Sequence, residues 1–194
     1  LFYNKFAYIN TFIGWKAVDI HTGETLWEKT PAEVENQRID WAQVFNYNNF
    51  QEFGSAALLY TTVSGGMFRV YDPMTGQYIA NVTNARSTSK IINYDSDGLR
   101  GEVLGYYTSG GNLCMYNYTR LFQSGWRVSA SGNINASTRD PVMWEVPLPT
   151  TFNGDSISLS IAGVTLDVIL VRQVPESMAL ANSGYQYAAG YDAK

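Results

Sequence analysis

The sequence predicts an all-β protein made of a short series of repeated antiparallel units. Three observations lead to this prediction: few charged residues, short apolar runs separated by turn residues, and a two-strand motif that recurs. Of the 194 residues, 45% are hydrophobic and only 15% are charged, and Tyr, Thr, Ser, Asn and Gly are abundant. This mixture favours half-buried strands over helices. The length allows one good-sized core or a row of smaller ones.

The predicted strands are apolar runs of five to eight residues bounded by turn residues. They cover residues 6–12, 15–20, 56–63, 67–71, 103–108, 113–118, 157–161 and 166–171. Only residues 31–45 carry a helical signal, with Pro31 at the start and acidic residues in the first turn. We therefore expect one short helix there, with Glu33, Glu35 and Asp40 facing solvent.

One strand–turn–strand unit recurs along the chain. Residues 60–72 read YTTVSGGMFRVYD, and residues 106–117 read YYTSGGNLCMYN. The two Ser-Gly-Gly turns lie 45 residues apart, and similar units begin and end the chain. Repeats of this length with several strands each have the period of β-propeller blades. The sequence thus predicts a single partial β-propeller domain over residues 1–194, with about four blades or partial blades.

The blade motifs lie near residues 14–30, 67–84, 112–149 and 185–194. If they are equivalent, they belong to successive four-stranded sheets, and no two share a sheet. The corresponding strand segments are residues 14–20, 67–72, 112–117 and 185–191.

Two hairpins carry the most informative turn residues. Asp19 and Asp72 each end a strand, and Gly23 and Gly76 follow four residues later. An Asp at the first turn position accepts hydrogen bonds from N–H groups two or three residues on, and the Gly supplies the positive φ that closes the hairpin. Trp27 stands on the strand that leaves the first hairpin, where a large ring can fill the gap between neighbouring sheets. We interpret this motif as structural, not catalytic.

Residues 17–28, AVDIHTGETLWE, resemble the repeat of the PQQ-like, or quinoprotein-type, β-propellers, whose blades read Ala-x-Asp-x-x-Thr-Gly-x-x-x-Trp. Residues 69–84 resemble a second copy without the Trp, and residues 190–194 the start of a third. The composition is similar to that of the non-enzymatic propellers of surface proteins. In the enzymes of this family, adjacent cysteines help to hold the quinone together with calcium. Cys114 is the only cysteine here, so no residue is assigned to a cofactor, and none is predicted.

The third blade motif departs from the pattern. Asn117 takes the Asp position, and the Trp that corresponds to Trp27 comes only at Trp144, after an insertion of 19 residues within 120–142. We expect Trp144 to pack between blades. The insertion is expected to be an exposed loop outside the ladder of its own blade, and such long loops are often functional. Its candidate binding residues are Trp126, Arg127 and Arg139, and the alternative is a passive surface excursion.

Other chemistry has little support in the sequence. His21 is the only histidine and lies at a hairpin tip, so a catalytic triad or zinc site is not expected. Asp95, Asp97 and Glu102 are weak candidates for a calcium site, because carboxylates alternate before a glycine. A turn that feeds the next strand is the simpler interpretation of that stretch. Cys114 is expected to be a small buried hydrophobe.

Three Asn-x-Ser/Thr sequons begin at Asn81, Asn117 and Asn135. Asn81 and Asn135 are the candidate glycosylation sites, and Asn135, inside the insertion, is expected to be the most accessible. Asn117 occupies a turn position that the backbone needs for itself.

The net charge of −4 argues against nucleic-acid binding, and no apolar stretch of 18 residues occurs that could span a membrane. The chain begins without Met and stops inside a motif, so we expect a piece of a larger protein. The predicted function is binding or scaffolding at the cell surface or outside the cell, with a protein or glycan partner. Trp15, Trp41 and Trp126 either stack on sugars or pack between blades. The alternative is a fragment of a quinoprotein-type oxidoreductase whose catalytic residues lie elsewhere.

Overall fold

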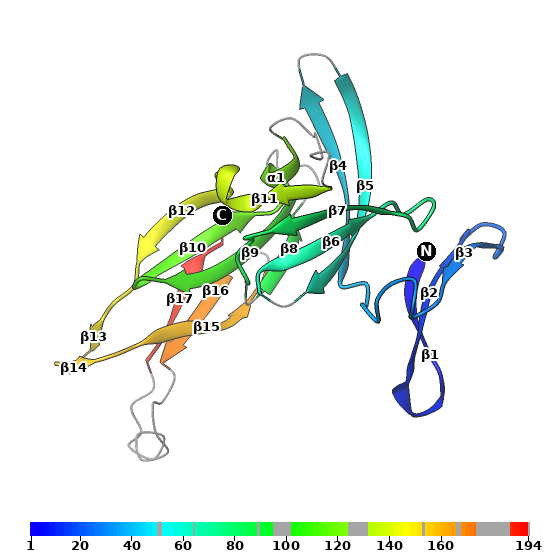
Figure 1. Cartoon of the computed structure of the whole chain (residues 1–194). Coiled ribbons are helices and arrows are strands. Elements are labelled where there is room, and N and C mark those ends of the chain that lie inside the picture. The colour runs from blue at the N-terminus through cyan, green and yellow to red at the C-terminus, as the bar shows by residue number, and fades with distance from the viewer. Residues whose placement is uncertain are drawn as a thin grey trace. The chain divides into compact units, whose positions relative to one another are not determined.

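The computed structural model describes the chain apart from residues 50–51, 64, 89, 95–101, 124–131, 153, 166–167, 174–186 and 194. Strands dominate the described residues, which confirms the all-β prediction (Figure 1). The chain forms two compact units. The first holds residues 1–86 and 121–140, and the second holds residues 87–120 and 141–194, so the chain passes between them three times.

The first unit contains two sheets. One is a three-stranded antiparallel sheet in the order β1-β2-β3, and the other has five strands in the order β11-β7-β6-β5-β4. The first sheet is formed by β1 (Phe2–Phe6), β2 (Phe12–Val18) and β3 (Thr25–Lys29). The second is formed by β4 (Trp41–Asn49), β5 (Glu52–Val63), β6 (Met67–Tyr71), β7 (Tyr78–Thr83) and β11 (Asn133–Asn135). All pairs are antiparallel except β11 with β7, which run parallel.

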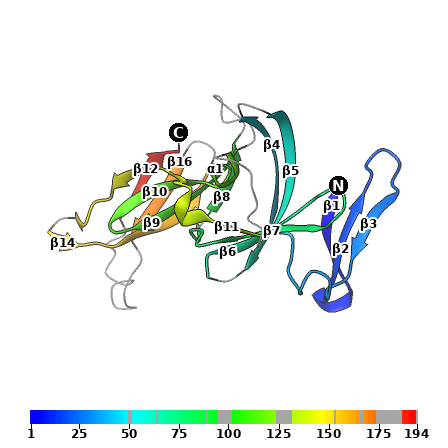
Figure 2. The same ribbon diagram turned by 45° about the horizontal axis from the view of Figure 1, so that its top comes forward.

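The second unit also contains two larger sheets, with the orders β12-β10-β9-β8 and β15-β16-β17 (Figure 2). The first is formed by β8 (Lys90–Tyr94), β9 (Glu102–Ser109), β10 (Asn112–Asn117) and β12 (Val142–Pro147). The second is formed by β15 (Leu159–Val164), β16 (Val168–Gln173) and β17 (Ala188–Asp192). A small hairpin, β13 (Thr151–Phe152) and β14 (Asp155–Ser156), connects them along the chain.

The four blade-motif segments fall in four different sheets, as β2, β6, β10 and β17. Each pairs antiparallel with the strand that precedes it in the chain. The sheets have three, five, four and three strands, so the expectation of four strands in each is wrong. The five-stranded sheet gains its extra strand, β11, from the insertion after Arg120.

Two local predictions are corrected by the structure. Residues 31–45 do not form a helix, because residues 31–36 are turns and β4 begins at Trp41. Glu35 and Asn36 have φ of 49° and 58°, a left-handed backbone that cannot continue a helix. Residues 6–12 are not one strand either. The chain reverses there through η1 (Tyr8–Asn10), so that β1 pairs with β2.

The core of the first unit joins its two sheets. Trp15, Val34, Leu59 and Tyr71 form a buried cluster, and Trp27 packs against it. The Trp15 ring meets Tyr71 edge-on at 4.8 Å between centroids, and its Nε1 donates to Gln37 O at 2.9 Å. Trp15 is thus fully buried, which excludes the stacking of sugars on it.

The core of the second unit lies between its two larger sheets. Leu104, Tyr106, Leu113 and Met115 of one sheet pack with Ile169 and Val171 of the other. Trp144 packs against this cluster, and its ring lies 6.1 Å from that of Tyr106. Cys114 is buried in β10.

Candidate functional site

The first Asp-Gly hairpin is held by its own backbone and by one carboxylate. Asp19 Oδ1 accepts hydrogen bonds from His21 N at 2.7 Å and from Thr22 N at 3.4 Å. Gly23, at φ 75°, donates its N–H to Asp19 O at 2.8 Å, and Thr22 Oγ1 accepts from Glu24 N. The sequence pattern predicts these bonds. His21 is exposed at the turn, and the Asp19 carboxylate binds the backbone of its own hairpin, so we interpret the turn as structural.

The second hairpin has the same geometry, and Trp27 of the neighbouring sheet covers it. Asp72 Oδ1 accepts from Met74 N at 2.7 Å, and Gly76, at φ 67°, donates to Asp72 O. Trp27 Nε1 donates to Pro73 O at 2.9 Å. A Cβ on Gly76 would lie only 2.9 Å from the Trp27 ring. The glycine therefore serves both the turn and the contact between the two sheets.

The insertion after Arg120 is in part core, contrary to the expectation of an exposed loop. Leu121, Phe122, Ile134 and Ala136 are each no more than 3% exposed. β11 extends the β7 edge through the register Asn133↔Asn81 to Asn135↔Thr83, and both views draw the two strands side by side (Figures 1 and 2). The inserted segment thus takes no part in the pairing of β10 with β12, the strands on either side of it. It contributes β11 to the sheet that contains β7 instead.

Among the candidate binding residues of that insertion, only Arg139 is described, and it is half-buried after η2 (Ala136–Thr138). Trp126 and Arg127 lie outside the described residues. Trp41 is half-buried and stacks on the Tyr60 ring at 3.6 Å. Of the two alternatives left open for the tryptophans, packing holds for Trp15, and Trp41 has one ring contact within its own sheet.

The structure describes only one of the three calcium candidates, so the predicted site stays a prediction. Asp95 and Asp97 lie outside the described residues, whereas Glu102 begins β9 and is buried. The described residues hold no group of three or more His, Cys, Asp or Glu side chains that could bind a metal ion.

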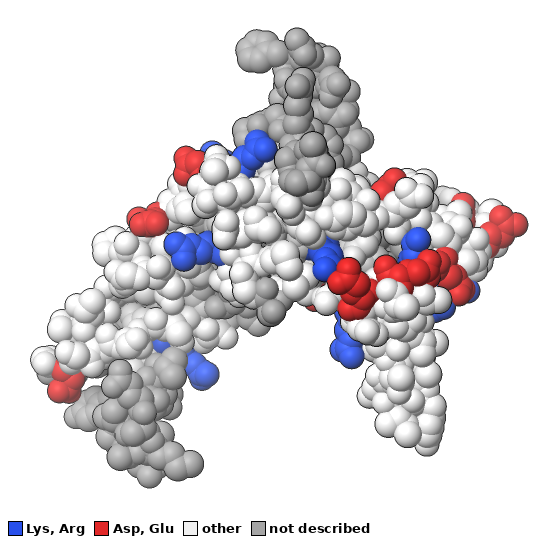
Figure 3. All heavy atoms as spheres, viewed as in Figure 1, with Lys and Arg blue, Asp and Glu red and all other residues white. Residues whose placement is uncertain are grey.

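An exposed apolar tip, formed by residues 6–13, is the main surface feature that the sequence did not predict. Tyr8 and Ile9 are 90% and 82% exposed, and Phe6 and Ile13 are also exposed. Residues 6–13 include no charged side chain, and the space-filling view shows this end of the β1–β2 hairpin without charge (Figure 3). Apolar residues on both sides of Asn10 made the segment resemble a strand. Asn10 and Thr11 were the only signal of a turn.

The backbone of the apolar tip is strained. Ile9 has φ 64° and ψ 33°, and Asn10 follows at φ 57°. Two successive residues with positive φ suit a tight hairpin turn, but Asn and Gly are the residues that normally adopt it. A β-branched residue there is unfavourable. Burial of the Ile9 side chain does not offset the cost of this backbone conformation, because the side chain is almost fully exposed.

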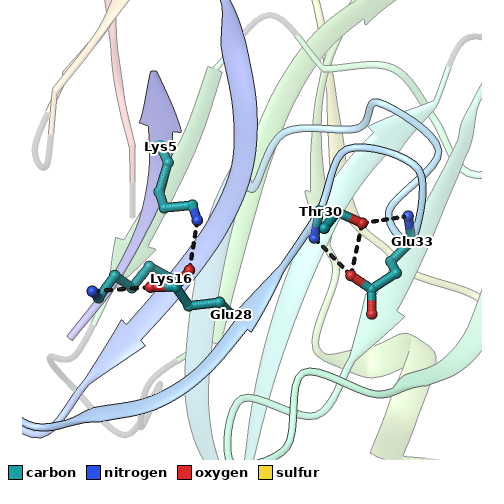
Figure 4. Close-up of polar contacts among 5 residues, drawn as sticks. All are labelled: Lys5, Lys16, Glu28, Thr30 and Glu33. Carbon is teal, nitrogen blue, oxygen red and sulfur yellow. Dashed lines mark hydrogen bonds and ion pairs between the residues drawn. The ribbon is translucent and has the colours of Figure 1, made fainter. Parts of the chain in front are cut away.

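An ion-pair network across all three strands holds the base of the apolar tip (Figure 4). Glu28 on β3 binds Lys5 of β1 at 2.8 Å and Lys16 of β2 at 3.0 Å. The hydrogen bond from Lys5, followed by that from Lys16, lowers the pKa of Glu28, and the bond to Glu28 raises the pKa of Lys16. The Arg38 guanidinium also lies over the Phe6 ring, 5.2 Å from its centroid. The tip therefore projects from a sheet whose three strands are connected by ion pairs.

Thr30 and Glu33 close the turn that follows this sheet (Figure 4). Glu33 Oε2 accepts from Thr30 N at 2.7 Å and from Thr30 Oγ1 at 2.8 Å. These bonds, from the backbone first, lower the pKa of Glu33. Glu35 pairs with Arg69 of β6 at 2.8 Å. The acidic residues of this segment thus hold turns and strands in place.

The second unit contains a cavity of about 260 Å³ at the β9–β10 turn. Its lining has no charged side chain and includes the hydroxyl-bearing residues Thr108, Ser109, Thr150 and Ser158. Such a lining suits a small neutral ligand better than an ion.

Searches of protein-family models, of curated proteins and of solved structures found no match to this chain. Within the described part of the chain, no helix has both the length and the apolar character that crossing a membrane requires.

Proposed function

We propose that this protein is a binding scaffold built from PQQ-like β-propeller blades, and that it works at the cell surface or outside the cell. Its partner is a protein or a glycan. The observation that carries the proposal is the exposed apolar tip at residues 6–13, on a sheet whose three strands are linked by ion pairs. Large exposed apolar groups on a rigid frame are typical of interaction sites.

The strain at Ile9 supports a role in binding. A residue held at an unfavourable φ without compensating contacts lowers stability by about 1 kcal/mol or more. Tyr8, next to it, is even more exposed and offers both an apolar ring and a hydroxyl. A partner that covers these two side chains would bury apolar area and compensate for the strain.

The blade architecture is supported by the recurrence of one hairpin and of one contact. The carboxylates of Asp19 and Asp72 both accept from the N–H two residues on, and Trp27 of the first sheet donates to the turn of the next. These features organise sheets and place no catalytic group. They therefore favour a scaffold over the alternative, an oxidoreductase of the quinoprotein type.

The test is the binding of the labelled chain to a glycan array and to intact cells, with or without protease treatment of the cells. The variant Tyr8→Ser/Ile9→Asn replaces the two most exposed apolar side chains of the tip and places Asn at the positive φ. Met74→Ser, at a side chain that is 69% exposed on another turn, is the matched control.

We expect the wild type and Met74→Ser to bind alike, and the tip variant to bind at least tenfold more weakly without melting at a lower temperature. Equal binding by all three proteins would contradict the proposed site. Substrate-dependent reduction of a dye after addition of quinone and calcium would favour the oxidoreductase instead.

A further inference from the structure

The three sequons differ in whether the asparagine side chain is accessible enough to carry a glycan. Asn135 ends β11, is exposed, and is the N-cap of η2. Its Oδ1 accepts from Ser137 N at 3.1 Å, from Ser137 Oγ at 2.8 Å and from Asn84 Nδ2 at 3.0 Å. The Ser137 hydroxyl thus already contacts the Asn135 side-chain amide. All three hydrogen bonds end on the carbonyl oxygen, and none of them involves the nitrogen that would carry the glycan.

The other two asparagines are less accessible than Asn135. Asn117 is 0% exposed. Its Oδ1 accepts from Thr119 N at 2.9 Å, and its Nδ2 lies against Met143 Sδ at 4.0 Å. A glycan on that nitrogen would have to displace the packing around Met143. The sequon at Asn117 is therefore incompatible with the native fold.

Asn81 lies within β7, between β6 and β11, and its backbone is paired on both sides with Arg69 and Asn133. Its N–H donates to Gly132 O at 2.8 Å, and its Oδ1 is buried. The insertion that adds β11 covers this edge of the sheet. Asn81, a candidate from the sequence, is thereby disfavoured.

We propose that Asn135 is the N-glycan acceptor of this protein and that Asn81 and Asn117 stay unmodified. The donor is a lipid-linked pyrophosphoryl oligosaccharide, and the catalyst is a membrane-bound transferase. The Asn135 Nδ2 forms a bond to the anomeric carbon of the sugar. The bond from that carbon to the pyrophosphate oxygen breaks, the pyrophosphate leaves with the electron pair, and the amide nitrogen loses one proton.

The native contacts survive this reaction. The product keeps the amide carbonyl, so the bonds from Ser137 and Asn84 to Oδ1 remain, and only an exposed N–H is replaced. The glycan would stand at the end of β11, beside the exposed Asn84. The inference goes beyond the proposed binding function and does not rest on it. It requires only that the chain reaches a compartment that contains the transferase.

The experiment is secretion of the full chain from a eukaryotic host, followed by intact mass measurement and peptide mapping. A flexible tag that carries its own sequon reports whether the chain met the transferase. Peptide-N-glycosidase converts each glycosylated Asn to Asp, which localises the modification. Asn135→Asp is the matched variant, because the carboxylate keeps the acceptor for Ser137 and Asn84 while the acceptor nitrogen is lost.

We expect the wild type to carry one glycan besides that of the tag, at Asn135. Asn135→Asp and Ser137→Ala should lose it, whereas Ser137→Thr and Asn81→Asp should keep it. An occupied tag with an empty Asn135 would overturn the proposal. A glycan at Asn117 or Asn81 in secreted protein that still unfolds cooperatively would overturn the exclusion of those positions.

Discussion

At the scale of single residues, Gly76 meets two requirements, and Gly23 shares only one of them. Both glycines have positive φ in equivalent turns. A Cβ added at Gly23 meets nothing within 4 Å, whereas a Cβ at Gly76 meets the Trp27 ring at 2.9 Å. The two positions therefore separate the conformational role of glycine from its packing role.

We expect Gly23→Ala to lower the free energy of unfolding by about 1 kcal/mol, the cost of a left-handed L-residue. Gly76→Ala should lower it further, because the ring of Trp27 must shift as well, and Gly76→Val further still. His21→Ala, at an exposed turn position, should have almost no effect. Urea unfolding measures all four. An equal loss for both glycines would show that Trp27 does not restrict position 76.

Glu28 is a second residue with a measurable role. Its pKa is lowered from the ordinary value of 4.5, so its ion pairs stabilise the fold above that value. This contribution is lost as the pH falls through the lowered pKa of the folded state. We expect Glu28→Gln to weaken the dependence of the melting temperature on pH below about 4.5 at low salt. High salt should reduce the difference, because exposed pairs are screened. An unchanged pH profile would exclude this role.

At the scale of elements, β11 shows how an insertion becomes part of a sheet. A strand of only three residues covers the edge of β7, and Ile134 and Phe122 on either side of the undescribed stretch are buried. The ring of Phe122 lies 6.0 Å from that of Tyr60. The inserted segment thus protects an edge that could otherwise pair with another chain.

Deletion of residues 123–139 tests this role. If these residues formed an exposed loop, their deletion would leave the stability of the fold unchanged. The deletion instead removes β11 and the buried Ile134. We expect Ile134→Ala alone to cost about 2–4 kcal/mol, and the deletion to cost more and to promote association through the bare β7 edge. Urea unfolding and light scattering provide the measurements. A cooperative, monomeric and equally stable deletion variant would contradict this assignment.

At the scale of the whole molecule, the described residues form a buried cluster within each of the two units. Trp15, Leu59 and Tyr71 belong to the core of the first unit, whereas Leu104 and Leu113 belong to that of the second. The division does not follow chain order, because residues 121–140 return to the first unit.

Leu59→Ala and Leu113→Ala are a matched pair for the two cores, since both side chains are 0% exposed. Each should cost about 2–5 kcal/mol. Hydrogen exchange should rise mainly in residues 1–86 and 121–140 for the first variant. For the second it should rise mainly in residues 87–120 and 141–194. The same pattern of exchange in both variants would show that the two units unfold as one.

The features that could be predicted from the sequence are those that depend on neighbours a few residues away. The all-β class follows from composition and short apolar runs, and the turns at Asp19 and Asp72 follow from Asp and Gly four residues apart. The recurrence of the strand–turn–strand unit also predicted that β2, β6, β10 and β17 lie in separate sheets. Turn and strand preferences act over short distances, so a single chain displays them directly.

The contacts between segments far apart in the chain could not be predicted from the sequence and are visible only in the folded structure. The pairing of β11 with β7 joins residues about 50 positions apart, and three residues are too few to show a strand period. The expected helix at 31–45 failed because Glu35 and Asn36 are left-handed, while Val34 is buried in the first core. The exposure of apolar side chains could not be predicted either. Trp15 packs in the core whereas Tyr8 and Ile9 project into solvent, and nothing in the sequence distinguishes the two cases. Burial depends on what lies opposite in space, and a single sequence does not record this.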